Sequence, residues 1–371
     1  MMKQFFRRRT EGGFSDNPFM IGYDNQIYEP DSEIGFRFPK GKLITDSGFD
    51  SLEKQVEQGK GKDILLNLGD SSTSGWNGNR VFSGNRNQNA PFFTYKTYPQ
   101  LIGEQTDLLS LNAGVPGYTS YQGVKYAKRL LKRLAALKRV PRYISIYFGN
   151  NDSTFNRIED KTRLDGKRAS HNPEGYRVTS EDFRKNLMVM VELARDYGSQ
   201  PVFIAPLVHL DWEPGIRAGS HREEFQEALC KSDENVRKDL EKAREYYKRG
   251  EFAQALELDR VLPRIKQAYR EIITEVAKQT DIPLVDVQDR VPLTANAEYF
   301  VDYCHPSEMS NHLIADEMLR LIGVRKGKTI RQKIDVPLKF RIMDGFVRLT
   351  DRFTSKKVTD HSKELYIYPF Y

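Results

Sequence analysis

Five short apolar runs, each four to six residues long, alternate with longer amphipathic segments along this 371-residue chain. Short apolar runs bounded by glycine, proline or asparagine are typical of strands that are buried on both faces of a sheet. Strands that alternate with helices form a parallel sheet with helices packed against it. The sequence therefore predicts an α/β fold built on a five-stranded parallel sheet. The predicted strands are Ile64–Leu68, Leu108–Leu111, Tyr143–Phe148, Val202–Ala205 and Leu284–Val287.

The loops that follow the first three predicted strands are rich in glycine, serine and asparagine. They read GDSSTSGW from Gly69, NAGVPGYTS from Asn112 and GNND from Gly149. Ligands of open α/β sheets bind beyond the carboxyl ends of the strands, where these loops begin. We therefore expect a functional site at that edge of the sheet.

Each of these loops has a structural interpretation as well as a chemical one. Ser71 is either an exposed nucleophile at the end of the first strand or part of an N-cap turn. The glycines of the second loop serve either a tight turn or the approach of a main-chain N–H to a substrate. Asn151 is either a turn residue or an amide that donates a hydrogen bond to an oxyanion. No single loop decides between the two interpretations.

A fourth motif, DYCHPS, places Asp302 three residues before His305. A carboxylate at that spacing can reach the histidine Nδ1, fix the tautomer of the ring and stabilise the imidazolium. The same pair also fits an ordinary hydrogen bond within a loop. The sequence alone leaves both interpretations open.

The remaining histidines and the cysteines point to no further chemistry. His209, His221 and His312 have no partner at a useful spacing, so we interpret them as surface or structural residues. Cys230 and Cys304 cannot form a disulfide framework, and no cluster has the spacing of zinc ligands. We expect neither a metal nor a cofactor.

In chain order, the serine, glycine, asparagine and Asp-x-x-His motifs resemble the sequence blocks of the SGNH hydrolases, also called the GDSL family. The resemblance covers about residues 60 to 322 and rests on GDSSTSG, NAGVPGYTS, GNND and DYCHPS. It implies a flavodoxin-like fold of three α/β/α layers, with the strands of the parallel sheet in the order 2-1-3-4-5.

The resemblance also implies a role for residues at matching positions. Ser71 is the expected nucleophile, His305 the general base and Asp302 its orienting partner. Together with the N–H of Ser71, the N–H of Gly117 and the side-chain amide of Asn151 are the expected oxyanion hole. Gly114 is an alternative to Gly117 in the second loop.

The expected reaction is serine-dependent hydrolysis of a carboxylic ester, either an O-acetyl sugar or a lipid ester, through an acyl-enzyme. Transfer of the acyl group to a saccharide would use the same residues. The non-enzymatic alternative is a scaffold that docks partners through a helical insertion and a basic tail.

The chain divides into three expected regions. Residues 1–60 are rich in glycine, proline, aspartate and asparagine and predict an irregular lead-in. Residues 61–322 predict the hydrolase domain, with a helical insertion at about 210–280 before the last strand. The insertion fits a helical cap or outer layer, or a helix pair that docks a partner. Residues 323–371 predict a basic C-terminal extension.

The positive charge of the chain is concentrated in that extension. The net charge is +7, and residues 323–371 carry 12 Lys/Arg against 5 Asp/Glu, which leaves 46 of each sign in the other 322 residues. A nucleic-acid-binding domain would be basic throughout, so we expect no nucleic-acid partner. The basic and apolar residues at 339–353 favour contact with an anionic membrane or an acidic protein, or packing on the hydrolase domain itself.

Sequence signals for membrane insertion or export are lacking. No apolar run approaches the roughly 18 residues of a spanning helix. The start MMKQFFRRRTEGG has no apolar region of the kind found in signal peptides. We expect a cytoplasmic protein as the chain stands, with peripheral membrane association left open.

Overall fold

Seven strands pair into one central sheet. They are β3 (Lys42–Thr45), β4 (Gly48–Ser51), β5 (Ile64–Gly69), β6 (Leu109–Gly114), β7 (Tyr143–Tyr147), β8 (Gln200–Ile204) and β9 (Leu284–Val285). Their order across the sheet is β4-β3-β6-β5-β7-β8-β9. The structure is a computed structural model that describes residues 28–39, 41–45, 48–76, 95–154, 175–215, 234–292 and 298–325.

The five strands predicted from the apolar runs are the parallel part of this sheet. Strands β6, β5, β7, β8 and β9 pair in parallel, which is the order 2-1-3-4-5 implied by the family resemblance. Every residue of β5 is buried because helices cover both faces of the sheet. The predicted α/β fold class is confirmed, but the sheet has seven strands rather than five. The two additional strands, β3 and β4, join antiparallel at the β6 edge.

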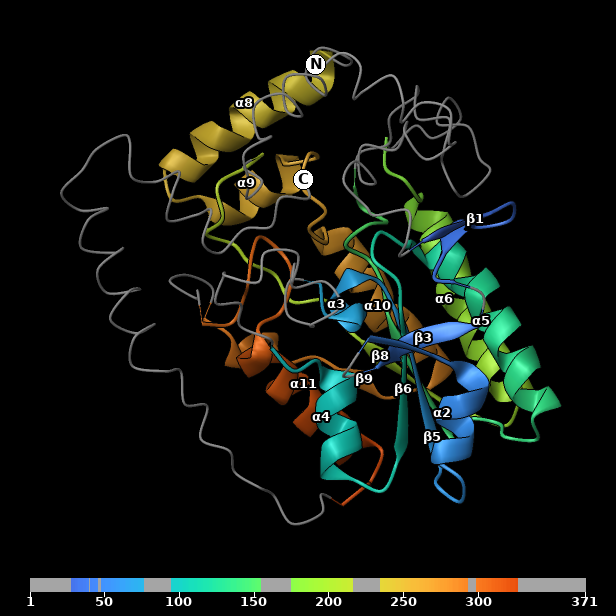
Figure 1. Ribbon diagram of the computed structural model, residues 1–371. Coiled ribbons are helices and arrows are strands. Elements are labelled where there is room, and N and C mark those ends of the chain that lie inside the picture. The colour runs from blue at the N-terminus through green and yellow to red at the C-terminus, as the bar shows by residue number, and fades with distance from the viewer. Residues whose placement is uncertain are drawn as a thin grey trace, which may run out of the picture.

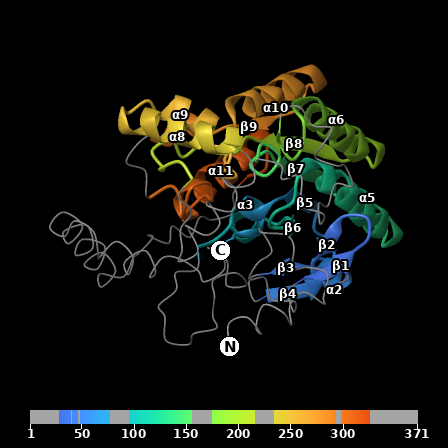
Figure 2. The same cartoon turned by 90° about the horizontal axis from the view of Figure 1, so that it is seen from above.

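Helices cover the two faces of the sheet (Figure 1). One layer contains α2 (Leu52–Gln58), α5 (Ser120–Ala136), α6 (Ser180–Asp196) and α10 (Gln267–Thr280). The opposite layer contains α4 (Tyr98–Gln105) and α11 (Glu308–Leu321), which contact each other. A short 3₁₀ helix, η3 (Gln288–Arg290), follows β9. Figure 2, viewed from above, shows α5, α6 and α10 in that order along one side of the strands.

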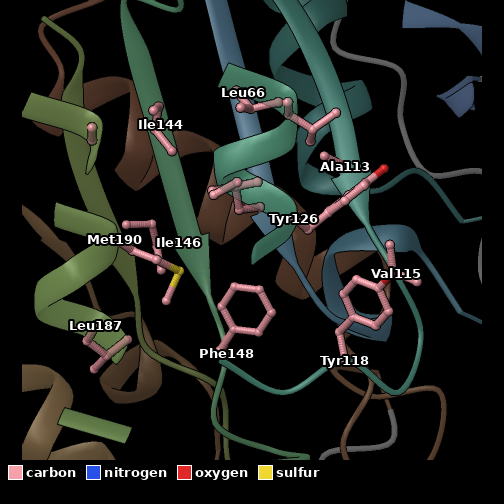
Figure 3. Close-up of a cluster of buried hydrophobic side chains, with 14 of the residues drawn as sticks. Leu66, Ala113, Val115, Tyr118, Tyr126, Ile144, Ile146, Phe148, Leu187 and Met190 are labelled. Carbon is pink, nitrogen blue, oxygen red and sulfur yellow. The ribbon is translucent and has the colours of Figure 1, made fainter. Parts of the chain in front are cut away.

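Helix α6 illustrates why these segments fold as they do. Its buried side chains recur at helical spacing, so that one face packs on the sheet and the other faces solvent. Figure 3 shows part of this core, in which Ile146 and Phe148 lie beside Met190 of α6. Thr179 accepts a hydrogen bond from the N–H of Asp182 and so caps the first turn.

The expectation of an irregular lead-in is wrong for residues 28–60. This segment contains β3, β4 and α2 of the main fold, preceded by a hairpin of β1 (Glu29–Asp31) and β2 (Gly35–Arg37). The strands are three or four residues long, too short for an alternating pattern to be recognised. The hairpin packs on the start of α5, where the Tyr118 hydroxyl donates a 2.6 Å hydrogen bond to the main-chain oxygen of Phe36. Residues 1–27 lie outside the described residues.

The helical insertion lies before the last strand, as the sequence predicts. Helix α10 packs against α6 and belongs to the layer on the sheet. The insertion proper is therefore the pair α8 (Glu234–Lys248) and α9 (Phe252–Leu258), which pack on each other. This pair stands at the end of the sheet where the parallel strands finish (Figure 1).

The basic extension lies almost wholly outside the described residues, which end at position 325. Contact of that extension with a membrane or an acidic protein stays a prediction. Among the residues that the structure describes, none of the helices combines the length and the apolar character needed to cross a bilayer.

Candidate functional site

Ser71 lies where β5 ends and the short helix α3 (Ser71–Ser74) begins. The residue before it, Asp70, is the N-cap, and its Oδ1 accepts a 2.8 Å hydrogen bond from the N–H of Ser72. Because Ser71 is the first residue of the helix, its own N–H has no acceptor within α3. The turn is tight, since a Cβ on Gly69 would lie 2.0 Å from Oγ1 of Thr73. The local sequence thus presents a serine hydroxyl and a main-chain donor at the carboxyl edge of the sheet.

His305 joins Ser71 to Asp302 through two short contacts. Its Nε2 lies 2.8 Å from Ser71 Oγ, and its Nδ1 lies 2.6 Å from Asp302 Oδ2. A carboxylate can only accept a hydrogen bond, so Nδ1 carries the hydrogen and Nε2 accepts from the serine hydroxyl. All three residues are buried, with Ser71 the most exposed at 8%. The structure therefore brings together three residues that are 234 positions apart at their extremes.

Asp302 is held in place by the loop in which it lies. Its Oδ1 accepts hydrogen bonds from the N–H groups of Cys304 and His305, at 3.0 and 2.9 Å. Burial alone would raise the pKa of this carboxyl, but the His305 ring and these hydrogen bonds outweigh burial and lower the pKa below its usual value. The carboxylate is therefore ionised at neutral pH and available to the His305 ring.

The two glycines of the second loop are distinguished by their surroundings. Gly114 donates its N–H to Oδ1 of Asn112 at 3.1 Å, and a Cβ on it would lie 2.4 Å from the main-chain nitrogen of Ser74. Gly114 thus serves the close packing of β6 on α3. Gly117 has a φ of +81° in a turn closed by Tyr118 N–H and the main-chain oxygen of Val115. The geometry favours Gly117 as the residue with an available main-chain donor.

Asn151 reaches the same edge of the sheet from the loop after β7. Its Nδ2 donates to Oδ2 of Asp70 at 3.2 Å and to the main-chain oxygen of Tyr118 at 3.1 Å. Both amide hydrogens are thus directed at acceptors in the first and second loops. The amide links all three loops, and it would have to share one of these hydrogens to donate to an oxyanion.

Asp70 was not singled out by the sequence, although it lies directly before the predicted nucleophile. It is completely buried, and burial raises its pKa to about 6, against the lowering effect of its hydrogen bonds with Ser72 and Asn151 and of the nearby His305. The residue beside the serine therefore titrates near neutrality, and its charge bears on the orientation of Asn151.

A second buried carboxyl, Asp152, closes the third loop. Its Oδ1 accepts from both the N–H and the hydroxyl of Ser120, at 2.9 and 2.6 Å. Its Oδ2 has no hydrogen-bond partner among the described residues. Burial raises the pKa of Asp152 to about 6. Asp152 ties the loop after β7 to the first residue of α5.

The expectation that His209 has no partner is wrong, whereas its burial fits the structural alternative and rules out a surface position. The residue is 7% exposed, its Nε2 lies 2.9 Å from Oδ1 of Asp211, and its Nδ1 lies 2.9 Å from the main-chain oxygen of Asp302. The His-x-Asp spacing was the available sequence signal, but contact with Asp302 depends on the tertiary fold. His221 lies outside the described residues, and His312 is partly exposed on α11.

Among the described residues, one cluster offers ligand atoms for a metal ion. These atoms belong to Asp302, Cys304 and His305 and lie within 4.8 Å of one another. The side chains of Asp302 and His305 are already joined by the 2.6 Å hydrogen bond between Nδ1 and Oδ2. A metal held by them would replace that hydrogen bond, so the cluster cannot serve both purposes at once.

Comparison with known sequences gives one family match over most of the chain. The profile of the GDSL-like Lipase/Acylhydrolase family matches residues 68–311. A curated relative, the uncharacterized lipoprotein YqeF of Bacillus subtilis, is 25% identical over 237 residues, which cover 62% of this chain and 72% of that protein.

Two solved structures illustrate the similarity in three dimensions. A lipase/acylhydrolase from Enterococcus faecalis is 19% identical, with a TM-score of 0.39 over 72% of this chain and 98% of the other. A catalytic mutant of the acetylxylan esterase Axe2 from Geobacillus stearothermophilus is 16% identical, with a TM-score of 0.37 over 71% of this chain and 95% of the other.

Proposed function

The chain belongs to the GDSL-like lipase/acylhydrolase family and is a hydrolase acting on ester bonds, and on that premise we propose that it cleaves a carboxylic ester through an acyl-enzyme on Ser71. The proposal assigns Ser71 as nucleophile, His305 as general base and Asp302 as the residue that orients His305. The proposed substrate is either an O-acetyl sugar or a lipid ester.

In the first half of the reaction, Ser71 Oγ forms a bond to the carbonyl carbon of the ester while its proton moves to Nε2 of His305. The carbonyl oxygen becomes an oxyanion, stabilised by the main-chain N–H groups of Ser71 and Gly117 and by the amide of Asn151. When the carbon–oxygen bond to the alcohol breaks, the alcohol oxygen takes the proton from His305. The acyl group is left on Ser71.

In the second half, water attacks the acyl carbon and gives its proton to Nε2 of His305. The second tetrahedral intermediate collapses, the bond to Ser71 Oγ breaks, and His305 returns the proton to the serine. Asp302 stays ionised throughout and stabilises the imidazolium that forms in each half. The low pKa of Asp302 supports this role.

The observation that carries the proposal is the unbroken hydrogen-bonded chain from Asp302 through His305 to Ser71, at 2.6 and 2.8 Å. Both distances lie within the range at which a base accepts a proton from a nucleophile. The serine lies at the start of a helix and at the carboxyl edge of a parallel sheet, where α/β proteins bind their ligands.

Hydrolysis of p-nitrophenyl esters from acetyl to octanoyl tests the proposal, with Ser71→Ala as the inactive variant. Ser72→Ala is the control for the adjacent hydroxyl, whose side-chain hydrogen-bond partners are Asp70 and Asn150. A fluorophosphonate probe followed by peptide mass spectrometry identifies the labelled serine. Hydrolysis that persists in Ser71→Ala would refute the assignment, whereas labelling of Ser71 without hydrolysis would indicate an acceptor other than water.

A further inference from the structure

A second histidine and aspartate pair lies directly behind the Asp302–His305 pair. His209 and Asp211 come from the loop after β8, whereas Asp302 and His305 come from the loop before α11. Nδ1 of His209 faces the main-chain oxygen of Asp302 at 2.9 Å. A carbonyl oxygen only accepts hydrogen bonds, so Nδ1 carries the hydrogen and donates it.

The His209 ring is fixed from several sides. It stacks on Phe300 with a centroid distance of 4.5 Å and an interplanar angle of 15°, and Trp212 meets it edge-on at 5.5 Å. Its Nε2 lies 2.9 Å from Oδ1 of Asp211, a contact that becomes an ion pair when the ring is protonated. Phe300 forms a bridge with Pro306 that closes the loop holding Asp302. The His209 ring therefore contacts the loop at two points, the main-chain oxygen of Asp302 and the side chain of Phe300.

A buried ion pair in the segment after α9 anchors the loop that carries His209. Arg264 and Asp259 follow α9, pair at 2.8 Å and are almost fully buried. The Arg264 guanidinium donates to the main-chain oxygen of His209 at 3.0 Å and to that of Trp212 at 3.3 Å. Removing an arginine from water is costly, and here its hydrogen bonds to two main-chain oxygens offset that cost and restrain the loop.

These contacts form one continuous path from the insertion to the nucleophile. Arg264 holds the main chain of His209, His209 holds the main chain of Asp302, and the Asp302 carboxylate holds the ring of His305. The main-chain oxygen that His209 contacts lies in the short segment that carries both the Asp302 side chain and His305. A displacement of that segment would therefore alter the 2.6 Å contact between Asp302 and His305.

We propose that His209 is a positioning residue, which fixes the Asp302 loop through its Nδ1–H and thereby aligns His305 with Ser71. The inference rests on the proposed function of those three residues. It gives the segment between α9 and α10 a structural role, because Arg264 in that segment braces the loop that carries His209.

Three substitutions separate the hydrogen bond from the packing of the ring. His209→Asn places an amide nitrogen near the position of Nδ1 and retains a donor toward Asp302. His209→Gln places its nitrogen near the position of Nε2 and retains only the contact with Asp211. His209→Phe retains the stack on Phe300 and has no donor. Asn and Gln both lose the ring, so a difference between them cannot come from the stack.

Two measurements are made on each variant after its thermal melt shows a folded protein. The first is kcat and KM for a p-nitrophenyl ester. The second is the downfield proton resonance of the His305 Nδ1–H, which reports the hydrogen bond to Asp302 whether or not an ester is hydrolysed. The second measurement keeps the inference testable if the proposed function fails.

We expect His209→Asn to keep kcat within about threefold of the wild type, a difference of under ~1 kcal/mol. His209→Gln and His209→Phe should lose at least about tenfold in kcat with little change in KM, since a displacement of ~1 Å can cost on the order of 10²-fold. The His305 resonance should stay in place in the first variant and shift or broaden in the other two. Equal kcat in folded Asn, Gln and Phe variants, or an unmoved resonance in all three, would overturn the proposal.

Discussion

The buried carboxylate of Asp70 accepts a hydrogen bond from the side chain of Asn151 at 3.2 Å, while its other oxygen caps the turn that carries Ser71. One side chain thus sets both the start of α3 and the direction of the Asn151 amide. The proposed nucleophile and the proposed oxyanion donor are therefore not independent of each other. The same carboxyl has its pKa raised to about 6 by burial.

Asp70→Asn tests this connection. Ser72 N–H and the Asn151 amide contact different oxygens of Asp70, and asparagine has an oxygen at only one of these two positions. A hydrogen bond to a charged group contributes ~1.5–3 kcal/mol, and we expect kcat to fall by roughly ten- to hundredfold. Steady-state kinetics should show the loss in kcat rather than in KM. An unchanged kcat in the folded variant would show that Asn151 does not depend on Asp70.

Asp302→Asn tests the orienting role proposed for that carboxylate. An amide in place of Oδ2 can present its nitrogen to His305, which favours the tautomer with hydrogen on Nε2 and removes the base for Ser71. In serine hydrolases with this arrangement, the corresponding loss in kcat is on the order of 10⁴-fold. Asp289→Asn is the matched control, because Asp289 is exposed in η3. A loss of less than about tenfold would contradict the proposed role.

Much of the fold could be predicted from the sequence because the apolar runs of the parallel strands are long enough to recognise. Leu65 and Leu66 in β5, for example, face opposite layers and are both fully buried, so apolar residues stand on both faces of the strand. The one polar side chain in the run, that of Asn67, is itself buried and donates a hydrogen bond to Ser110. The short strands β3 and β4 carried no such pattern. Their place in the sheet is set by tertiary contacts, such as the pairing of Ile44 with Asn112.

The site was predictable to the extent that it is encoded in local motifs. Ser71, Asp302 and His305 each lie in a short motif after a strand or before a helix, and the fold brings them together. His209 and Arg264 could not be assigned in this way, because their contacts with the Asp302 loop join segments that lie far apart in the sequence.

The pH dependence of stability tests the burial of Asp152. Its folded-state pKa of about 6 lies above the ordinary value of 3.8, so the folded protein holds the proton more tightly than the unfolded chain. Stability from this group is therefore fully present below about pH 4 and is lost as the pH rises through about 6. The loss is on the order of 3 kcal/mol.

Asp152→Asn removes this titration. Chemical denaturation at several pH values should show the free energy of unfolding of the wild type, relative to that of the variant, falling by roughly that amount between pH 4 and pH 8. Asp70 titrates in the same range, and its charge also raises the pKa of Asp152, so the difference between the two proteins contains this coupling as well as the burial of Asp152. A difference that does not change with pH would mean that Asp152 is not buried in the folded protein as described.

Gly114→Ala tests the close approach of β6 to the helix that carries Ser71. The added Cβ would lie 2.4 Å from the main-chain nitrogen of Ser74 and 2.8 Å from the main-chain carbon of Thr73, so α3 itself must move. We expect a loss of ~1–3 kcal/mol in the free energy of unfolding, together with a fall in esterase activity.

Gly103→Ala is the control, because Gly103 lies inside α4 and a Cβ there meets only Ser110 Cβ, at 3.5 Å. That substitution should stabilise the protein by ~0.5–1 kcal/mol. Thermal melts compare the stability of the two variants. Equal stability would contradict the described packing of α3 on β6.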